Sequence, residues 1–420
     1  AIAQAGGRSP RNMLATTFAD ELAKSTAGAS KVFGVAGKDR SAVAMAGHGG
    51  KAFWLSAATG HFETSRYYYD AYPDWVEVWN SANPADALVG ARWELAFPPD
   101  SYLLAEQDDR PYEADLRGFG RTFPLPYGNP EDGLYYTQVL LSPLGDELTA
   151  EFALEAVRAE GLGADTTPDY LSVSFSGVDA ANHFFGPSSL ENEEMVRNLD
   201  CILAGFFAAL DAEVGADHVL YVLSADHGMP EIAEYSTELG FAAARGDTGA
   251  LHTALNADIA QRFGVTEAVR AFFRPYVYLD SEAIAEAGAD QRAIERLIVD
   301  GLEADPSIAL ALPVAPFTEQ RGHRLAEQIR NNFHPARSGQ IYVAQAPYAF
   351  LLEGGLITVM HGSPWSYDTH VPVIFAGPGV PAQTIDRRIA TTDVAVTLSA
   401  LFGTGRPSGA SGRVLDEVMP

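Results

Sequence analysis

Helical patterns and short apolar runs alternate along this chain, and this alternation constrains the fold more than any other feature. A helical pattern over 13–22 precedes an apolar run over 31–35. The same order returns with a helical pattern near 148–160 and a strand at 170–175, and then with a long helix and a strand at 218–223. Strands separated by helices pair in parallel, so we expect an α/β fold with a doubly wound, mostly parallel sheet and helices on both faces.

The long helix between the last two strands has its own signals. Ser188 and Glu191 have the spacing of a capping box, which predicts the start of the helix. Apolar residues recur on one face, at Met195, Leu199, Ile202, Phe206 and Leu210. We interpret this helix as core structure, and we assign no function to Asp200 or Cys201.

Two segments interrupt the alternation. Residues 61–147 are rich in Pro, Gly and aromatic residues and have little periodicity, so we expect an insert. Residues 272–330 contain two strand patterns and one helical pattern, which predicts a small α+β cap. The predicted strands of the cap are 276–279 and 308–312, and its helix is 291–302.

The last part of the chain returns to the α/β pattern. It has strand patterns at 341–344 and 371–375 and a helix that begins near Thr392. The core is therefore predicted to be discontinuous, and its three segments are 1–60, 148–271 and 331–420.

Composition narrows the function. The 420 residues carry a formal net charge of −27, which opposes nucleic acids and anionic membrane surfaces, so we expect no nucleic-acid-binding surface. No run of 18 apolar residues occurs, so no membrane-spanning helix is predicted. Cys201 is the single cysteine, so a metal would have to be bound by His and carboxylates.

Two segments after predicted strands carry pairs of possible metal ligands. In SVSFSGVDAANHFFGP, Asp179 and His183 are four residues apart and would share one face of a helix. In VLSADHGMP, a strand runs directly into Asp226 and His227, and Gly228 leaves the backbone free to bend. The alternatives are a surface ion pair for the first pair and an ordinary strand end for the second.

Two further segments carry a histidine and a pair of cations. His361 stands in the turn MHGSP, and we prefer it to His370 as a ligand because Gly and Ser flank it. In GVAGKDRSAV, Lys38 and Arg40 begin a helix, where cations oppose the helix dipole unless an anion binds between them. The alternative is a pair of solvated charges with Asp39 as partner.

Together these segments supply two Asp and three His, more than one tetrahedral zinc ion needs. We therefore expect two metal ions, which can clamp the attacking and leaving oxygens of an in-line displacement at phosphorus. Lys38 and Arg40 would bind the remaining phosphoryl oxygens and make the site locally positive.

The chain resembles the alkaline phosphatase superfamily, in particular the single-chain bacterial alkaline phosphatases related to type I phosphodiesterases and nucleotide pyrophosphatases. The motifs that carry this resemblance are SPRNMLATTFADEL, AGKDR, SFSGVDAANHFFGP, SADHG, HPARSGQ, HGSPWSYDTHVP and TTDVAVTLSALFG.

The resemblance implies a ligand set and a substrate. Asp179, His183 and His361 would hold one zinc ion, and Asp226 and His227 part of a second. Lys38 and Arg40 would bind the phosphoryl group, and a Lys-x-Arg pair is associated with the monoesterase branch. The expected substrates are small-molecule phosphate monoesters, and the expected location is the periplasm or outside the cell. The resemblance assigns no oligomeric state.

The resemblance also implies a phospho-enzyme, formed on a Thr or Ser that follows a strand ending in a zinc-binding Asp. No segment of this sequence matches that strand, so we expect the nucleophile and one zinc ligand to lie outside these 420 residues. Thr16 and Thr17 are interpreted as structural. The chain alone should then bind the second ion weakly and hydrolyse esters poorly. Two alternatives stay open: a phosphodiesterase of the same superfamily, and a metal-binding domain without catalytic activity.

Overall fold

The computed structural model describes residues 7–317, 324–352 and 355–419. Its main sheet has the strand order β3-β2-β1-β6. Strand β1 (Val32–Ala36) runs parallel to β2 (Lys51–Leu55) and β6 (Tyr170–Ser174), whereas the short β3 (Phe62–Glu63) is antiparallel to β2. The predicted α/β fold with a mostly parallel sheet is confirmed.

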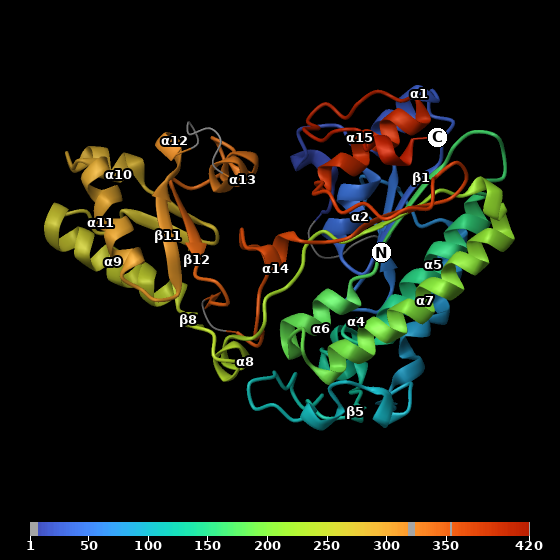
Figure 1. Cartoon of the computed structure of the whole chain (residues 1–420), viewed down its shortest axis with the longest axis horizontal. Helices are drawn as coiled ribbons and strands as arrows, with labels where there is room; N and C mark the ends of the chain where they lie inside the picture. The colour runs from blue at the N-terminus through green and yellow to red at the C-terminus, as the bar shows by residue number, and fades with distance from the viewer. Residues whose placement is uncertain (1–6, 318–323, 353–354, 420) are drawn as a thin grey trace.

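Helices cover both faces of this sheet (Figure 1). Because side chains alternate along a strand, Phe33 and Val35 of β1 pack on one face with α5 (Pro143–Glu160) and α7 (Leu190–Val214). Ala36 points to the other face and packs against α2 (Asp39–Ala46). The alternating side chains of β1 therefore contact helices on both faces of the sheet.

A second pair of strands lies beside the main sheet. Strand β7 (Tyr221–Ser224) pairs antiparallel with β14 (Val373–Ala376). It begins later than predicted because residues 216–218 form a 3-10 turn. Helices α1 (Phe18–Ser25) and α15 (Thr392–Phe402) pack over both sets of strands in one hydrophobic cluster, which also contains Tyr170 of β6.

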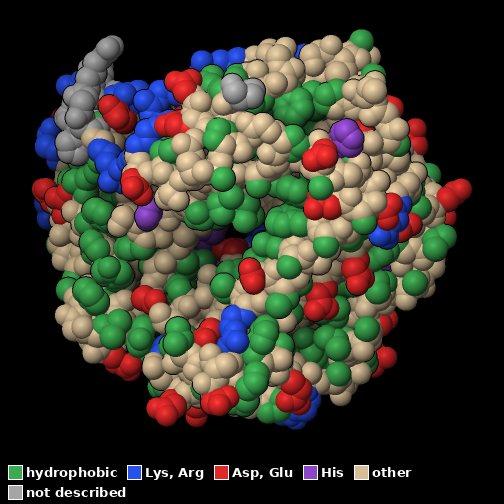
Figure 2. All heavy atoms as spheres, turned by 45° about the vertical axis from the view of Figure 1, so that its right-hand side comes forward, with side chains coloured by type: hydrophobic (Ala, Val, Ile, Leu, Met, Phe, Trp, Pro, Cys, Tyr) green, Lys and Arg blue, Asp and Glu red, His purple; other side chains and the backbone are tan. Residues whose placement is uncertain are grey.

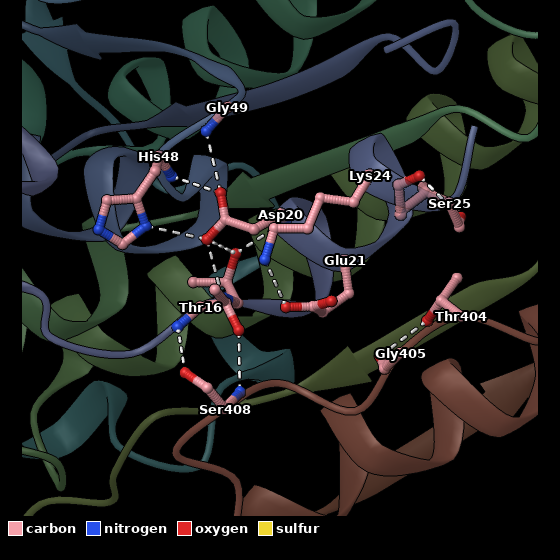
Figure 3. Close-up of polar contacts among 12 residues, drawn as sticks. Thr16, Asp20, Glu21, Lys24, Ser25, His48, Gly49, Thr404, Gly405 and Ser408 are labelled. Carbon is pink, nitrogen blue, oxygen red and sulfur yellow. Dashed lines mark hydrogen bonds and ion pairs between the residues drawn. The ribbon is translucent and has the colours of Figure 1, made fainter. Parts of the chain in front are cut away.

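Polar contacts fix α1 in place (Figure 3). Thr17 caps its first turn, and Thr16 exchanges hydrogen bonds with Ser408 of the C-terminal segment. The buried Asp20 accepts hydrogen bonds from the backbone N–H groups of His48 and Gly49 and contacts the His48 ring at 3.0 Å. These contacts confirm the structural interpretation of both threonines.

Residues 61–147 extend the main core. Phe62 stacks on Phe152 of α5 with ring centroids 4.0 Å apart, and α3 (Asp74–Ala82) and α4 (Tyr135–Leu140) contribute to the same hydrophobic cluster. Many aromatic residues of this segment are therefore core residues, although Tyr67 is exposed.

A second sheet forms a lobe of its own, with the strand order β11-β12-β10-β9 (Figure 1). The predicted strands β10 (Tyr276–Leu279) and β11 (Ile308–Pro313) and the predicted helix α11 (Gln291–Glu303) lie here. Strand β12 (Ile341–Gln345), which we assigned to the core, instead pairs antiparallel with β10 and β11. The boundaries of the three predicted domains stay a prediction.

The start of α7 differs from the expectation by one residue. Ser189 caps the helix by accepting a hydrogen bond from the Asn192 N–H, whereas the Ser188 hydroxyl donates to Glu231. Met195, Phe206 and Leu210 are buried, as predicted, and Cys201 is exposed.

The remaining elements complete the described chain. They are η1 (Pro10–Asn12), η2 (Pro84–Leu88), β4 (Arg92–Trp93), η3 (Pro99–Ser101), η4 (Ala105–Gln107), β5 (Leu125–Pro126), η5 (Pro130–Asp132), α6 (Gly177–Phe185), η6 (Ala216–His218), α8 (Ala233–Glu238), β8 (Arg245–Gly246), α9 (Thr248–Phe263), β9 (Val269–Phe273), α10 (Ser281–Glu286), α12 (Val314–Phe317), α13 (Arg324–Asn332), β13 (Phe350–Leu351), α14 (Ser366–Thr369) and η7 (Asp416–Val418). Within the described ranges, no helix combines the length and apolar character needed to cross a membrane.

Candidate metal centre

Four chain segments converge at the carboxyl ends of β1, β6 and β7. Strand β6 leads into α6, whose first and second turns carry Asp179 and His183. Strand β7 leads to His227, and the loop before α14 carries His361. Strand β1 ends next to Lys38, the N-cap of α2. This is the edge at which open α/β sheets bind ligands.

The three imidazoles surround one carboxylate oxygen. The Oδ1 atom of Asp179 lies 3.4 Å from Nε2 of His183, 3.7 Å from Nε2 of His227 and 3.6 Å from Nε2 of His361. Asp179, His227 and His361 each offer a ligand atom within 4.8 Å of the others. The rings of His227 and His361 stack with centroids 3.4 Å apart.

Hydrogen bonds to backbone carbonyls fix two of the imidazole tautomers. Nδ1 of His183 lies 2.9 Å from the carbonyl oxygen of Val359, and Nδ1 of His227 lies 2.9 Å from that of Gly228. A carbonyl oxygen only accepts, so Nδ1 carries the proton in each ring. This tautomer directs Nε2 toward Asp179, and Nε2 is the atom that such a histidine offers to a metal.

The Asp179 oxygen has the character of a metal ligand. Its Oδ1 is buried and has no hydrogen-bond partner among the described residues, whereas Oδ2 accepts from the Lys38 ammonium group. Burial alone would raise the Asp179 pKa, but Lys38 and His183 outweigh it and hold the pKa below its ordinary value. The carboxylate is therefore charged, and one of its oxygens is available to a cation.

Burial also keeps two of the histidines neutral. It lowers the pKa of His183, against the opposing effect of Asp179. Burial and the neighbouring His227 lower the pKa of His361 to about 4. Neutral imidazoles and a charged carboxylate form an N/O donor set that suits zinc, so these residues fit the metal that the sequence implied.

Two predicted residues lie at the margin of this group or away from it. Asp226 contacts His227, with Oδ2 3.6 Å from Nε2, but its side chain is 82% exposed. The Arg40 side chain is also 82% exposed, and its ion-pair contact in the described chain is with Asp39 at 4.0 Å. The structure therefore brings Lys38 to the metal cluster without Arg40.

The site opens to solvent beside β14. A pocket of about 1100 Å³ is lined by Asp226, His227, His370 and the loop over 380–391. Figure 2 shows a hollow near the centre of one face of the molecule, with histidine and acidic atoms at its floor. The exposed His370 thus lies beside this pocket, whereas His361 lies in the cluster around Asp179.

Sequence reasoning missed two buried carboxylates that hold the site in place. Asp146 accepts a hydrogen bond from the N–H of Gly177, the first residue of α6. Asp368 accepts one from Ser363 N–H at 2.6 Å, and its backbone oxygen accepts from Gly228 at 2.8 Å. Gly228 was a sequence signal for this close approach to the α14 segment, because a Cβ at position 228 would lie 2.0 Å from the Tyr367 carbonyl oxygen.

Comparison with known proteins agrees with this arrangement. Residues 15–358 match the type I phosphodiesterase / nucleotide pyrophosphatase family. The chain belongs to this family. The predicted membership of the alkaline phosphatase superfamily is confirmed.

Three curated relatives cover almost the whole chain. Alkaline phosphatase PafA of Elizabethkingia meningoseptica is 32% identical over 430 residues, covering 99% of this chain and 76% of the relative. Alkaline phosphatase PhoV of Synechococcus elongatus is 30% identical over 99% of this chain and 75% of the relative. A protein named calcium-transporting ATPase, from Myroides odoratus, is 31% identical over 99% of this chain and 76% of the relative.

A solved structure shares the fold. The crystal structure of wild-type alkaline phosphatase PafA superposes with a TM-score of 0.90 at 30% identity, covering 98% of this chain and 79% of that one. The chain thus spans about three quarters of the length of these relatives.

Proposed function

We propose that this chain is the metal-binding core of a phosphate monoester hydrolase that works with two zinc ions. The observation that carries the proposal is the buried Oδ1 of Asp179, which lacks a hydrogen-bond partner in the described chain and faces three imidazole Nε2 atoms. The relatives named alkaline phosphatase support the same activity.

The ligands divide into two sets. Asp179, His183 and His361 would hold one zinc ion, and Asp226 and His227 would supply part of the coordination of the second. The short distance between the His227 and His361 rings supports two neighbouring ions. Bound zinc would supply Lewis-acid stabilisation for the charge that develops on the phosphoryl oxygens.

Lys38 would orient the phosphoryl group. Its ammonium group lies against Asp179, so a substrate oxygen bound to Lys38 would also lie next to the metal ligands. A fixed positive charge in this half-buried position stabilises a phosphoryl group without reorganisation. We propose that Arg40, at the exposed start of α2, takes part only after its side chain turns toward a bound phosphate.

We further propose that the phospho-enzyme forms on a Thr or Ser outside these 420 residues, carried by a strand between β6 and β7. In the described part of the chain, β6 pairs along one edge with β1, and β7 pairs along one edge with β14. Both strands are half exposed, whereas β1 is buried throughout. A parallel strand between them would end at the metal cluster.

The activity test uses the protein expressed from its whole coding sequence. We expect zinc-dependent hydrolysis of p-nitrophenyl phosphate, and we expect Asp179→Asn to lower kcat/KM by at least ~10³-fold. Lys38→Ala should lower kcat/KM for this monoester by about 10²-fold and for bis-p-nitrophenyl phosphate by less. Lys24→Ala is the matched control, because Lys24 is exposed on α1 and forms its ion pair with Glu21 of the same helix.

Several outcomes would count against the proposal. Unchanged zinc content in Asp179→Asn would contradict the ligand assignment. A phosphopeptide recovered from within residues 1–420 after an acid quench would contradict the external nucleophile. Zinc binding without turnover in the complete protein would favour a metal-binding domain without catalytic activity.

A phosphodiesterase is the second candidate, because the matched family carries that name. A higher kcat/KM on the diester than on the monoester, with little effect of Lys38→Ala on either, would support it. We also propose that the protein acts in the periplasm or outside the cell, on the basis of its similarity to the bacterial phosphatases. Cell fractionation with an antibody to the protein tests this location.

A further inference from the structure

A second group of buried acidic side chains lies at the far end of α6. The segment over 108–114 is held against this end, because the Ala114 N–H donates to the Phe184 carbonyl at 2.9 Å. Arg110 donates to the Ser188 carbonyl at 2.8 Å, just before α7 begins. These hydrogen bonds bring Glu113 next to the helix end that carries Glu191.

Glu113 and Glu191 are buried without the partners that buried carboxylates normally have. Glu113 is 4% exposed and Glu191 is 0% exposed. Both carboxylate oxygens of each residue lack a hydrogen-bond partner within the described ranges. The same is true of buried amide oxygens on the two helices, those of Asn182 and Asn192. Glu113 acts electrostatically on Glu191, and Asn182 and Asn192 lie on the two helices that meet across residues 186–189.

An arrangement of this kind is costly without a cation. Burial, followed by the effect of Glu113, raises the pKa of Glu191 well above its ordinary value. Burial raises the pKa of Glu113 to about 8. Asp108, whose Oδ1 is also buried and unpartnered in the described structure, adds to the negative potential at both.

The nearby arginine does not satisfy these acids. Arg110 directs its guanidinium group to the Ser188 carbonyl and to Gln107, and it stacks over the Tyr235 ring at 4.2 Å. When all three acids are ionised, one guanidinium charge would leave Asp108, Glu113 and Glu191 with an excess of negative charge. A divalent cation would remove this excess.

We propose that Glu113 and Glu191 bind a calcium ion, and that the amide oxygens of Asn182 and Asn192 complete the protein ligands. The donors are all oxygens, which calcium prefers, and this group contains no histidine. We do not include Asp108 among the ligands. In the described chain, three acidic or histidine ligand atoms come close together only in the cluster at Asp179, so Asp108 would act on the ion through its charge. The ion would clamp α6 to α7 and to the 108–114 segment.

The proposed calcium ligands differ from the proposed zinc ligands. Asn182 directly precedes His183 on α6, but Glu113 and Glu191 lie on other segments, in residues 108–114 and at the start of α7. The two sites also differ in chemistry, since one combines imidazoles with carboxylates and the other offers oxygens alone. Metal content can therefore be measured for each site independently.

The test compares the zinc-loaded protein, desalted into calcium-free buffer, with the same protein in calcium chloride. We expect about one calcium ion per chain after desalting, measured by mass spectrometry of the metals, and a higher Tm in calcium. Glu191→Gln and Glu113→Gln should each lose the calcium ion and the Tm response while keeping their zinc. Glu106→Gln, at an exposed position in the preceding 3-10 turn, is the matched control and should keep both responses.

Each result decides the matter. A wild-type protein that retains no calcium and has the same Tm in calcium-free buffer and in calcium would overturn the proposal and favour protonated acids that share a buried site. Variants that keep the wild-type calcium content would overturn the ligand assignment. If either variant fails to fold, the calcium response of the wild type and of Glu106→Gln still decides between these outcomes. Loss of calcium with unchanged zinc supports the site, whatever the outcome of the activity assays.

Discussion

Replacing Asp146 by asparagine should remove one contribution to the pH dependence of the unfolding free energy. Asp146 lies on α5 and is 1% exposed. Its Oδ1 accepts a hydrogen bond from Gly177 N–H at 3.0 Å, while Oδ2 is buried with no partner among the described residues. Asparagine keeps the accepting oxygen and removes the buried charge.

The magnitude follows from the pKa. Burial raises the pKa of Asp146 from 3.8 to about 7, against the hydrogen bond from Gly177. The folded state therefore holds this proton more tightly than the unfolded state between these values, and stability falls as the pH rises through them. At about 1.4 kcal/mol per pH unit, the charged carboxylate costs the folded protein roughly 4 kcal/mol above pH 7.

The assay is urea unfolding of the metal-free protein from pH 4 to pH 9, followed by circular dichroism. Wild type and Asp146→Asn should differ little near pH 4, and the variant should gain relative stability up to pH 7 and then keep a constant advantage. Asp258→Asn, at an exposed position on α9, is the matched control. Parallel curves for wild type and Asp146→Asn would refute the reasoning, as would a variant that loses relative stability at alkaline pH.

Three further substitutions test contacts that hold the fold and the site. Asp20→Asn should cost about 2 kcal/mol, because it removes a buried charge that several donors satisfy. The His48 ring lowers the Asp20 pKa against the effect of burial, and Asp20 is the main cause of the raised His48 pKa. The loss of unfolding free energy in Asp20→Asn should therefore be largest between about pH 4 and 6.5, where both groups are charged. Urea unfolding measures this loss, and a loss that does not vary with pH would contradict the prediction. Gly228→Ala should cost roughly 1–3 kcal/mol and lower the zinc content, because its Cβ would lie 2.0 Å from the Tyr367 carbonyl oxygen; full zinc content would contradict this. Phe152→Ala should cost about 3–5 kcal/mol, measured by urea unfolding, because its ring is fully buried; a cost below about 1 kcal/mol would show that the core refills the cavity.

The sequence predicted most strands and helices because their patterns are local. Strand 276–279 and the helix that starts at Gln291 lie where the periodicity indicated. The partner of strand 341–345 could not be predicted in the same way, because a short, fully buried apolar run looks alike in a parallel and an antiparallel sheet. The cap of α7 was missed for a similar reason: both Ser188 and Ser189 can cap, and the contact with Glu231 decides between them.

In the candidate site, too, local features were predictable and long-range contacts were not. Asp179 and His183 were predictable, because a spacing of four residues on a helix fixes their common direction. The long-range approach of His361 to His227 follows only from the fold, although the turns that carry both residues were visible as motifs. Buried acids such as Asp146 and Glu191 resemble surface acids in the sequence, because burial is a tertiary property.

Helix α6 links these observations. Its first turn is held by the Gly177 hydrogen bond to Asp146, and its last turn is held by the hydrogen bond from Ala114 to Phe184. The carbonyl oxygen of His183 itself accepts from the Thr358 N–H at 2.7 Å, close to the segment that carries His361. A displacement of about 1 Å in a reacting group can cost ~10²-fold in rate. The helix that carries two of the proposed ligands is therefore fixed at its first turn and by two hydrogen bonds at its last turn, as a site preorganised for phosphoryl transfer requires.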